Sequence, residues 1–222
     1  MRKEVIGRAT LYCGDSRDLI SELTGVDVII TDPPYGIGFE YNEYQDTEDS
    51  LCDLIEELII PLINKFERAV ITPGNTNLHR YPKPAWTGAW TWDTTTARGF
   101  YGWSQWQPIL MYGKDPASGF GSHNGILRSD RIHFSGGQAD IEGSAGEIHT
   151  CPKPVKFMTR LVARFTTEAD CVFDPFLGSG TTGVATSKLG REFIGCEIDP
   201  AYFDIACRRI EHAQRQLDMF IN

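Results

Sequence analysis

Apolar residues near the N-terminus follow two different spacings, one typical of strands and one of helices. Mostly apolar runs at 9–13, 26–31 and 69–72 predict short buried strands. Between the last two runs, apolar residues recur at helical spacing, and Pro61 predicts that this helix ends nearby. The helical stripe consists of Leu51, Leu54, Ile55, Leu58 and Ile59.

The same alternation resumes after residue 149. A helical stripe covers 155–165, and runs at 171–174 and 193–197 predict two further strands. A glycine loop and a helix to about Leu189 separate these strands, and a last helix carries the apolar stripe from Tyr202 to Ile210. Strands that alternate with helices predict an α/β fold, with a mostly parallel sheet covered on both faces.

The middle of the chain, residues 75–148, has a different pattern. It contains all five tryptophans and many glycines, and only 106–112 predicts a strand. We expect an insertion of loops and short strands, with at least half of the tryptophans in a small core beneath them. Loops on a rigid scaffold commonly carry recognition residues. The predicted organisation is therefore one domain formed by 1–74 and 149–222, interrupted by the insertion 75–148.

Composition places the chain among ordinary globular proteins. It has 222 residues, of which 41% are hydrophobic and 23% charged. The N-terminus lacks an apolar leader and no run is long enough to span a bilayer, so a cytoplasmic protein without membrane contact is expected. No two of the six cysteines are spaced C-x-x-C, which predicts reduced thiols and no zinc site.

Charge is unevenly distributed. The net charge is −9, which by itself disfavours a nucleic-acid partner. Residues 40–57, however, contain eight acids and no Lys or Arg, whereas 79–131 contain six bases and three acids. Local charge decides which partner binds where. The acidic segment predicts either a mobile loop that orders when a partner binds or a solvated helix start with acids near its N-terminus.

A glycine-rich loop follows the strand at 171–174. The segment from Asp174 to Gly183 reads DPFLGSGTTG, which places G-x-G-x-x-G between a strand and a helix. Such a loop lets a ligand approach the backbone closely, and Glu197 at the end of the next strand is placed to accept two ribose hydroxyls. Three residues separate the strand from the first glycine, which disfavours NAD, and no Lys follows the glycines as in a P-loop.

A second motif, Asp32-Pro-Pro-Tyr35, follows the apolar strand 26–31. It therefore lies at the carboxyl edge of the sheet, where open α/β folds bind ligands. The Asp32 carboxylate and the Pro33 carbonyl are placed to accept the two hydrogens of an NH2 group, and the Tyr35 ring to stack on a flat ring. An ordinary turn needs only one proline and no aromatic residue.

Together these motifs resemble the amino-group DNA methyltransferases that use S-adenosylmethionine. His149-Thr-Cys-Pro-Lys153-Pro154 and the segment from Arg191 to Tyr202 resemble two further elements of that family. The order, with the catalytic motif before the cofactor loop, is that of the beta group. The resemblance covers about 1–74 and 149–215, and it implies a Rossmann-like methyltransferase fold with permuted motifs.

The resemblance also implies roles for individual residues. Asp32, Pro33 and Tyr35 would hold the target base, with Pro34 shaping the turn. Asp15 would lie near the cofactor adenine, although an N-cap is an almost equally good interpretation. Glu197 would bind the ribose. The other residues implied on the cofactor side are Lys153, Asp174, Phe176, Gly178, Gly180 and Thr181.

The implied partner is double-stranded DNA from which one base is flipped out. Basic residues of the insertion are expected to contact phosphates; they are Arg80, Lys83, Arg98, Arg128 and Arg131. Asp at the first motif position favours adenine N6 over cytosine N4. RNA and protein-glutamine methylation are disfavoured by Asp32 and by the motif order, whereas a non-catalytic partner subunit stays open. A homodimer and a bacterial or bacteriophage source are also expected.

Overall fold

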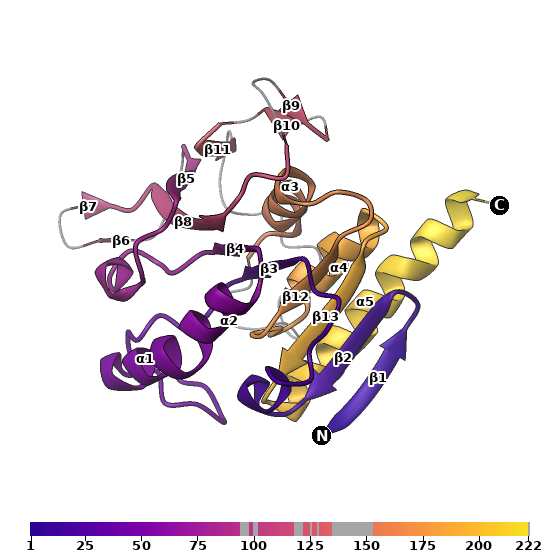
Figure 1. Cartoon of the computed structure of the whole chain (residues 1–222), viewed down its shortest axis with the longest axis horizontal. Helices are drawn as coiled ribbons and strands as arrows, with labels where there is room; N and C mark the ends of the chain where they lie inside the picture. Colours follow the sequence, from indigo (N-terminus) through magenta and orange to yellow (C-terminus); the bar gives the residue numbers. More distant parts are fainter. Residues whose placement is uncertain are drawn as a thin grey trace.

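The computed structural model describes residues 1–93, 98–99, 102–117, 122–124, 126–127, 129–134 and 153–221. Its centre is a nine-stranded sheet in the order β1-β2-β13-β12-β3-β4-β8-β5-β11 (Figure 1). The five strands from β2 to β4 are mutually parallel. They are β2 (Ala9–Cys13), β13 (Glu192–Glu197), β12 (Cys171–Asp174), β3 (Val28–Thr31) and β4 (Arg68–Ile71). The predicted α/β fold is confirmed, and each of these strands coincides with a predicted apolar run.

Helices cover both faces of the sheet (Figure 1). One face packs against α3 (Val155–Phe165), α4 (Thr181–Lys188) and α5 (Pro200–Ile221). The other packs against η1 (Ser16–Leu19), α1 (Glu48–Leu54), η2 (Ile55–Ile59) and α2 (Ile60–Lys65). Successive side chains of β3 supply both cores, because Val28 and Ile30 face the first set of helices and Ile29 faces the second.

The predicted helix end near Pro61 is wrong. The helical run continues to Lys65, and a π-helical turn, η2, comes directly before the proline. In this turn the Ile60 N–H donates to the carbonyl of Ile55, five residues back. The wider turn changes the hydrogen-bond ladder at the point where proline, which has no N–H, would otherwise break it.

Three strands of the sheet come from within 75–148. They are β8 (Trp106–Gly113), β5 (Trp86–Trp92) and β11 (Arg131–Phe134), and only β8 was predicted. Residues 98–99 with 102–103 and 122–123 with 126–127 form two small antiparallel pairs. At the opposite edge, β1 (Arg2–Ile6) pairs with β2 and was also missed, because its side chains are mostly exposed. The division into a catalytic unit and an insertion stays a prediction.

The tryptophans divide into a buried pair and three exposed residues. Trp90 and Trp92 are 2% and 5% exposed and pack in the core beneath α3, where Trp90 stacks on Phe157 with ring centroids 4.2 Å apart. Trp86, Trp103 and Trp106 are 62%, 60% and 44% exposed. The expectation of a separate small core holding at least half of them is therefore wrong.

No helix in the described part of the chain is long and apolar enough to cross a membrane. Five cysteines are free thiols, and Cys151 lies outside the described residues. Those five agree with the reduced state expected from the sequence.

The position of Trp90 gives a stability prediction. Trp90→Ala should lower the free energy of unfolding by about 3–5 kcal/mol, because it removes a large buried side chain. Trp86→Ala is the matched control on the same strand, and it should cost less than about 0.5 kcal/mol. Urea denaturation measures both. Equal losses would contradict the core placement of Trp90.

Candidate active site

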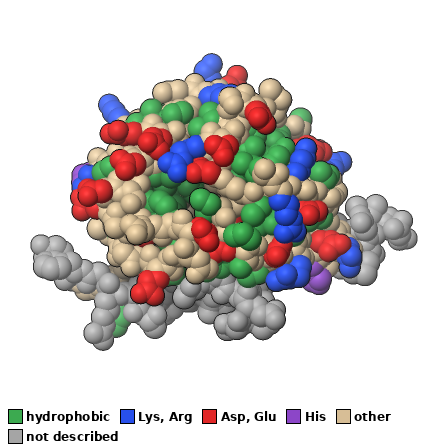
Figure 2. Space-filling view, turned by 90° about the horizontal axis from the view of Figure 1, so that it is seen from below, with side chains coloured by type: hydrophobic (Ala, Val, Ile, Leu, Met, Phe, Trp, Pro, Cys, Tyr) green, Lys and Arg blue, Asp and Glu red, His purple; other side chains and the backbone are tan. Residues whose placement is uncertain are grey.

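The five parallel strands end at one edge of the sheet. Asp15 follows β2, Asp32 follows β3 and Thr72 follows β4, whereas Asp174 and Glu197 are the last residues of β12 and β13. Figure 2 looks onto this edge and shows acidic side chains on several sides of an apolar hollow. The chain leaves β12 toward α4 and leaves β3 toward α1, on opposite faces. This switch between faces is where α/β sheets open a crevice for ligands.

Asp32 binds three other side chains in this crevice. Its Oδ1 accepts hydrogen bonds from the Tyr35 hydroxyl and the Thr72 hydroxyl, each at 2.7 Å. The Lys153 ammonium lies 2.8 Å from both Oδ1 and Oδ2, and it also donates to the Tyr35 hydroxyl. Oδ1 therefore has three partners. Among the described residues Oδ2 accepts from Lys153 alone, which leaves it the better acceptor for an incoming N–H.

Tyr35 is held from two sides. One face of its ring lies against Gly74, where an added Cβ would be 3.0 Å from ring carbons, and Gly74 has φ +68°. Its backbone carbonyl accepts a hydrogen bond of 2.8 Å from the buried Asn77 side chain. A side chain at position 74 would push the ring out of place, so this glycine is needed both for its φ and for the close approach.

The acidic segment 40–57 is more ordered than either expectation implied. Asp46 is 3% exposed, and its carboxylate accepts from the N–H groups of Gly36, Ile37 and Phe39. Helix α1 then begins with Thr47 as N-cap and two acids in its first turn. The predicted helix start is confirmed, but Asp46 acts as a buried clasp that fixes the backbone following Tyr35.

The glycine loop is tied down from β13 and from α5. Gly178 N donates to Glu197 Oε2 at 2.6 Å. Gly180 has φ +85° and packs so closely on α5 that an added Cβ would lie 2.9 Å from Ala206 Cα. From the same helix, Arg209 donates to the Ser179 carbonyl at 2.6 Å. The loop is thus held in place by contacts within the protein itself.

Burial alters the acidity of two of the site's carboxyl groups. Burial raises the pKa of Glu197 to about 7, although the N–H groups of Asp199 and Gly178 oppose this effect. Burial likewise raises the pKa of Asp174 to about 6, against hydrogen bonds from Thr182, Thr31 and Phe176 N. Asp174 is 2% exposed and joins the end of β12 to Thr31 of β3 at 2.6 Å. Its contacts are those of an anchor between the two loops.

Asp15 takes the N-cap interpretation and also lines the cavity. Its carboxylate accepts from Arg17 N at 2.9 Å, and the Arg17 guanidinium binds both of its oxygens. The hydrogen bond from Arg17 lowers the pKa of Asp15. Arg17 also pairs with Glu57 at 2.6 Å, so its charge is already shared between two acids.

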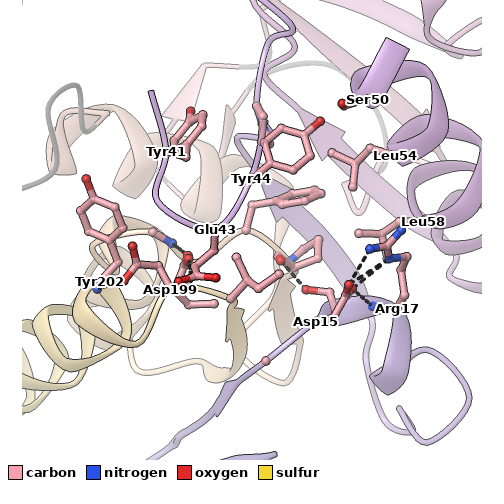
Figure 3. Close-up of a pocket in the computed structure, with 18 of the residues that line it drawn as sticks. Asp15, Arg17, Tyr41, Glu43, Tyr44, Ser50, Leu54, Leu58, Asp199 and Tyr202 are labelled. Carbon is pink, nitrogen blue, oxygen red and sulfur yellow. Dashed lines mark hydrogen bonds and ion pairs between the residues drawn. The ribbon is translucent and has the colours of Figure 1, made fainter. Parts of the chain in front are cut away.

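Two adjoining cavities occupy the crevice. One of about 310 Å³ lies between Asp15, Glu197 and Asp199, and the segment Tyr41–Tyr44 lies over it (Figure 3). A second of about 230 Å³ contains Pro33, Tyr35 and Lys153. Asp32, Tyr41, Phe176 and Gly178 line both cavities. Most of the predicted site residues are therefore brought together around one divided pocket, which Thr181 also lines; Gly180 lies in the loop behind it.

The described lining is rich in acids. Only two bases, Arg17 and Lys153, line the cavities among the described residues. The acids are Asp15, Asp32, Glu43, Asp46, Asp53, Asp174, Glu197 and Asp199. Such a lining favours a ligand with net positive charge and hydroxyl groups, and it disfavours the phosphates of a dinucleotide.

Comparison with known proteins agrees with this geometry. The model of a family described as DNA methylase, N6_N4_Mtase, matches residues 89–208, more than half of the chain. The chain belongs to this DNA methylase family. The match includes the glycine loop and most of 75–148, where no family motif was recognised from sequence.

Individual relatives support the family and the fold. The chain is 44% identical over 71 residues to the Type II methyltransferase M2.DpnII of Streptococcus pneumoniae, which is 32% of this chain and 26% of that protein. The M1.HpyAVI–SAM complex has a TM-score of 0.69 at 24% identity, covering 91% of this chain and 98% of that one. The cytosine-N4-specific PvuII DNA methyltransferase has 0.68 at 15%, covering 96% and 93%. These two structures show the Rossmann-like fold of class I methyltransferases.

The basic side chains predicted to contact DNA differ in their exposure and in their partners. Lys83 and Arg131 are exposed. Arg80 instead pairs with Glu48 and lies 3.4 Å from the side chain of Asn77, which itself holds the Tyr35 carbonyl. The side chain of Arg98 and all of Arg128 lie outside the described residues, as does His149.

Several residues that build the site were not found from sequence. Asn77 and Arg209 act through contacts with segments 42 and 30 positions away, whereas Asp46 binds backbone N–H groups only 7 to 10 positions before it. Thr72 had one usable signal, since it directly follows a predicted strand parallel to the one before Asp32. No sequence signal pointed to the partners of Lys153.

Glu197 predicts a pH dependence of stability. Its folded-state pKa of about 7 lies above the unfolded value, so between about pH 4.5 and 7 only the folded protein keeps this proton. The free energy of unfolding should therefore fall as pH rises through this window, by on the order of 3 kcal/mol from this group.

The matched variants are Glu197→Gln and Glu192→Gln, the second being exposed on the same strand. Denaturation at several pH values should give a smaller decline for Glu197→Gln and a wild-type decline for Glu192→Gln. Parallel profiles for wild type and Glu197→Gln would contradict the buried, protonatable Glu197.

Proposed function

We propose that this DNA methylase transfers a methyl group from S-adenosylmethionine to the N6 amine of an adenine flipped out of double-stranded DNA. The observation that carries the proposal is the position of Asp32. It lies in the wall between two cavities, with Oδ2 the less occupied of its two oxygens. The larger cavity has the carboxylates Asp15 and Glu197, which can bind a nucleoside. The smaller has Pro33 and Tyr35, which can bind a flat ring with an amine.

The larger cavity fits S-adenosylmethionine. That cofactor carries a sulfonium, an ammonium, a carboxylate and a ribose diol, with no phosphate. Glu197 lines the cavity and is placed for the diol, while the surrounding acids suit the net positive charge. When bound, the cofactor supplies an electrophilic methyl group. The relative M1.HpyAVI has been solved in complex with SAM, which supports the same assignment here.

The chain's own residues prepare the amine. The lone pair of an exocyclic amine is delocalised into its ring, so the amine is a poor nucleophile. Hydrogen bonds from the amine to Asp32 Oδ2 and the Pro33 carbonyl would favour a pyramidal nitrogen with a localised lone pair. These bonds strengthen as the nitrogen becomes positive, so they bind the transition state better than the ground state. Tyr35 supplies a ring face for stacking.

Adenine is preferred over cytosine because Asp occupies the first motif position, as in adenine-N6 enzymes of the resembling family. Cytosine N4 is the second candidate. It is favoured by the PvuII enzyme, which is cytosine-N4-specific and shares the fold with a TM-score of 0.68. Adenine and cytosine both present an amine beside a ring nitrogen, so the same Asp32 and Pro33 acceptors serve either base.

DNA recognition is assigned to the exposed part of 75–148. Lys83 and Arg131 are exposed cations for phosphate contact, and Trp103 and Trp106 offer exposed rings. The Trp106 carbonyl accepts from Asn75, which closely follows β4. A homodimer that shares recognition and a bacterial or phage setting belong to the same proposal.

The methyl-transfer prediction concerns Asp32. Nucleoside mass spectrometry of unmethylated DNA incubated with protein and S-adenosylmethionine should detect N6-methyl-deoxyadenosine. Asp32→Ala should reduce turnover by at least about 100-fold, because the amine loses its acceptor, while cofactor binding is retained.

Glu197→Ala is the contrasting variant, since it should weaken cofactor binding first. N4-methyl-deoxycytidine would keep the mechanism and change the base. Near-normal turnover by Asp32→Ala would refute the catalytic assignment.

A salt prediction tests the DNA-binding surface. Removing one cation that binds a phosphate should reduce the slope of log affinity against log salt concentration by about one. The double variant Lys83→Ala/Arg131→Ala should therefore have a slope smaller by about two, measured by fluorescence anisotropy. An unchanged slope would exclude these two side chains from the interface.

A further inference from the structure

Lys153 uses all of its hydrogen-bonding capacity on the catalytic loop. An ammonium group has three donors. Here its three acceptors are Asp32 Oδ1, Asp32 Oδ2 and the Tyr35 hydroxyl. The Lys153 side chain is 8% exposed, so water offers it little else. In this state Lys153 has no N–H left for a ligand.

This arrangement conflicts with the chemistry proposed for Asp32. During methyl transfer the target nitrogen becomes positive, and Asp32 stabilises it through its negative charge. An ammonium 2.8 Å from both carboxylate oxygens cancels much of that charge. It also takes one of the two lone pairs of Oδ2, the oxygen to which the amine is assigned. Asp32 would therefore act more strongly after Lys153 has moved away.

The cavities offer Lys153 one alternative partner. S-adenosylmethionine carries a carboxylate, which needs a cation in a lining that is otherwise acidic. Among the described residues only Arg17 and Lys153 are basic there, and Arg17 is bound to Asp15 and Glu57. Lys153 lies in the same cavity as Asp174 and the glycine loop. It is therefore the cation best placed to receive the carboxylate.

We propose that Lys153 exchanges partners when the cofactor binds, leaving Asp32 for the cofactor carboxylate and so freeing Asp32 for the target amine. This inference rests on the proposed function. Lys153 is a positioning residue that couples the two cavities: it keeps the partly buried Asp32 carboxylate paired until the cofactor binds. Because such coupling is reciprocal, capture of the amine by Asp32 also strengthens cofactor binding.

Calorimetric binding of two cofactor products tests the exchange without turnover. S-adenosylhomocysteine keeps the carboxylate, and 5′-deoxy-5′-methylthioadenosine lacks the whole amino-acid part. Lys153→Met should weaken S-adenosylhomocysteine binding about tenfold and leave methylthioadenosine binding within about twofold. Lys3→Met, an exposed lysine on β1, is the charge-matched control and should change neither.

A second variant should change S-adenosylhomocysteine affinity in the opposite direction. Asp32→Asn removes the resting partner of Lys153, so S-adenosylhomocysteine should bind about three- to tenfold more tightly, with methylthioadenosine unchanged. In the Lys153→Met background the same change should give no gain. A purely structural role of Lys153 would not make Asp32→Asn improve binding.

The outcomes separate the two proposals. Binding of both compounds by wild type, with no selective effect of Lys153→Met and no gain from Asp32→Asn, would overturn the exchange alone. Binding of neither compound by correctly folded wild type would contradict the proposed function itself. If Lys153→Met does not fold, as judged by circular dichroism, the Asp32→Asn arm decides.

Discussion

The site depends on one buried hydrogen bond, from the Thr31 hydroxyl to Asp174 Oδ1 at 2.6 Å. It joins the last residues of two neighbouring parallel strands, β3, which leads to Asp32 and Tyr35, and β12, which leads to the glycine loop. The same oxygen accepts from Phe176 N at 3.0 Å, so the start of the glycine loop is fixed to the same point. Burial raises the pKa of Asp174 to about 6, which is the electrostatic cost of placing this carboxyl at the junction. These two hydrogen bonds fix the position of the Asp32 side of the pocket relative to the glycine loop.

Around this junction the protein collects negative charge. Each acid has a different local purpose: Asp46 clasps three backbone N–H groups, Asp15 caps η1, and Glu197 joins the glycine loop to the end of β13. Their sum makes a pocket suited to a positively charged nucleoside. The exposed cations Lys83 and Arg131, to which we assign DNA contact, are not among the residues that line the two cavities. The net charge of −9 therefore describes the pocket and the acidic helix start more than the proposed DNA surface.

Much of this architecture was predictable because the central strands are buried on both faces. Runs such as Val28–Thr31 are buried at every position, so they are continuous in the sequence and easy to recognise. Edge strands such as β1 have mixed exposure and carry no such signal. The motif residues Asp32 and Glu197 could be placed because each directly follows or ends a strand. The hydrogen bonds of Arg209 to the glycine loop and the pairing of Lys153 with Asp32 depend on how distant segments pack, which local pattern does not encode.

The strand order has a consequence for how the protein is made. Thr31 and Asp174 are 143 positions apart, and β2 pairs with β13 across a similarly long stretch of chain. During synthesis β3 emerges long before the strand that covers its inner edge, and until then β4 is its neighbour in the sheet. Non-local pairing of this kind slows folding and leaves apolar edges open to aggregation in the meantime. The Asp32 side of the pocket is therefore synthesised well before the glycine loop and Glu197 that complete it, and its apolar edge stays uncovered during that interval.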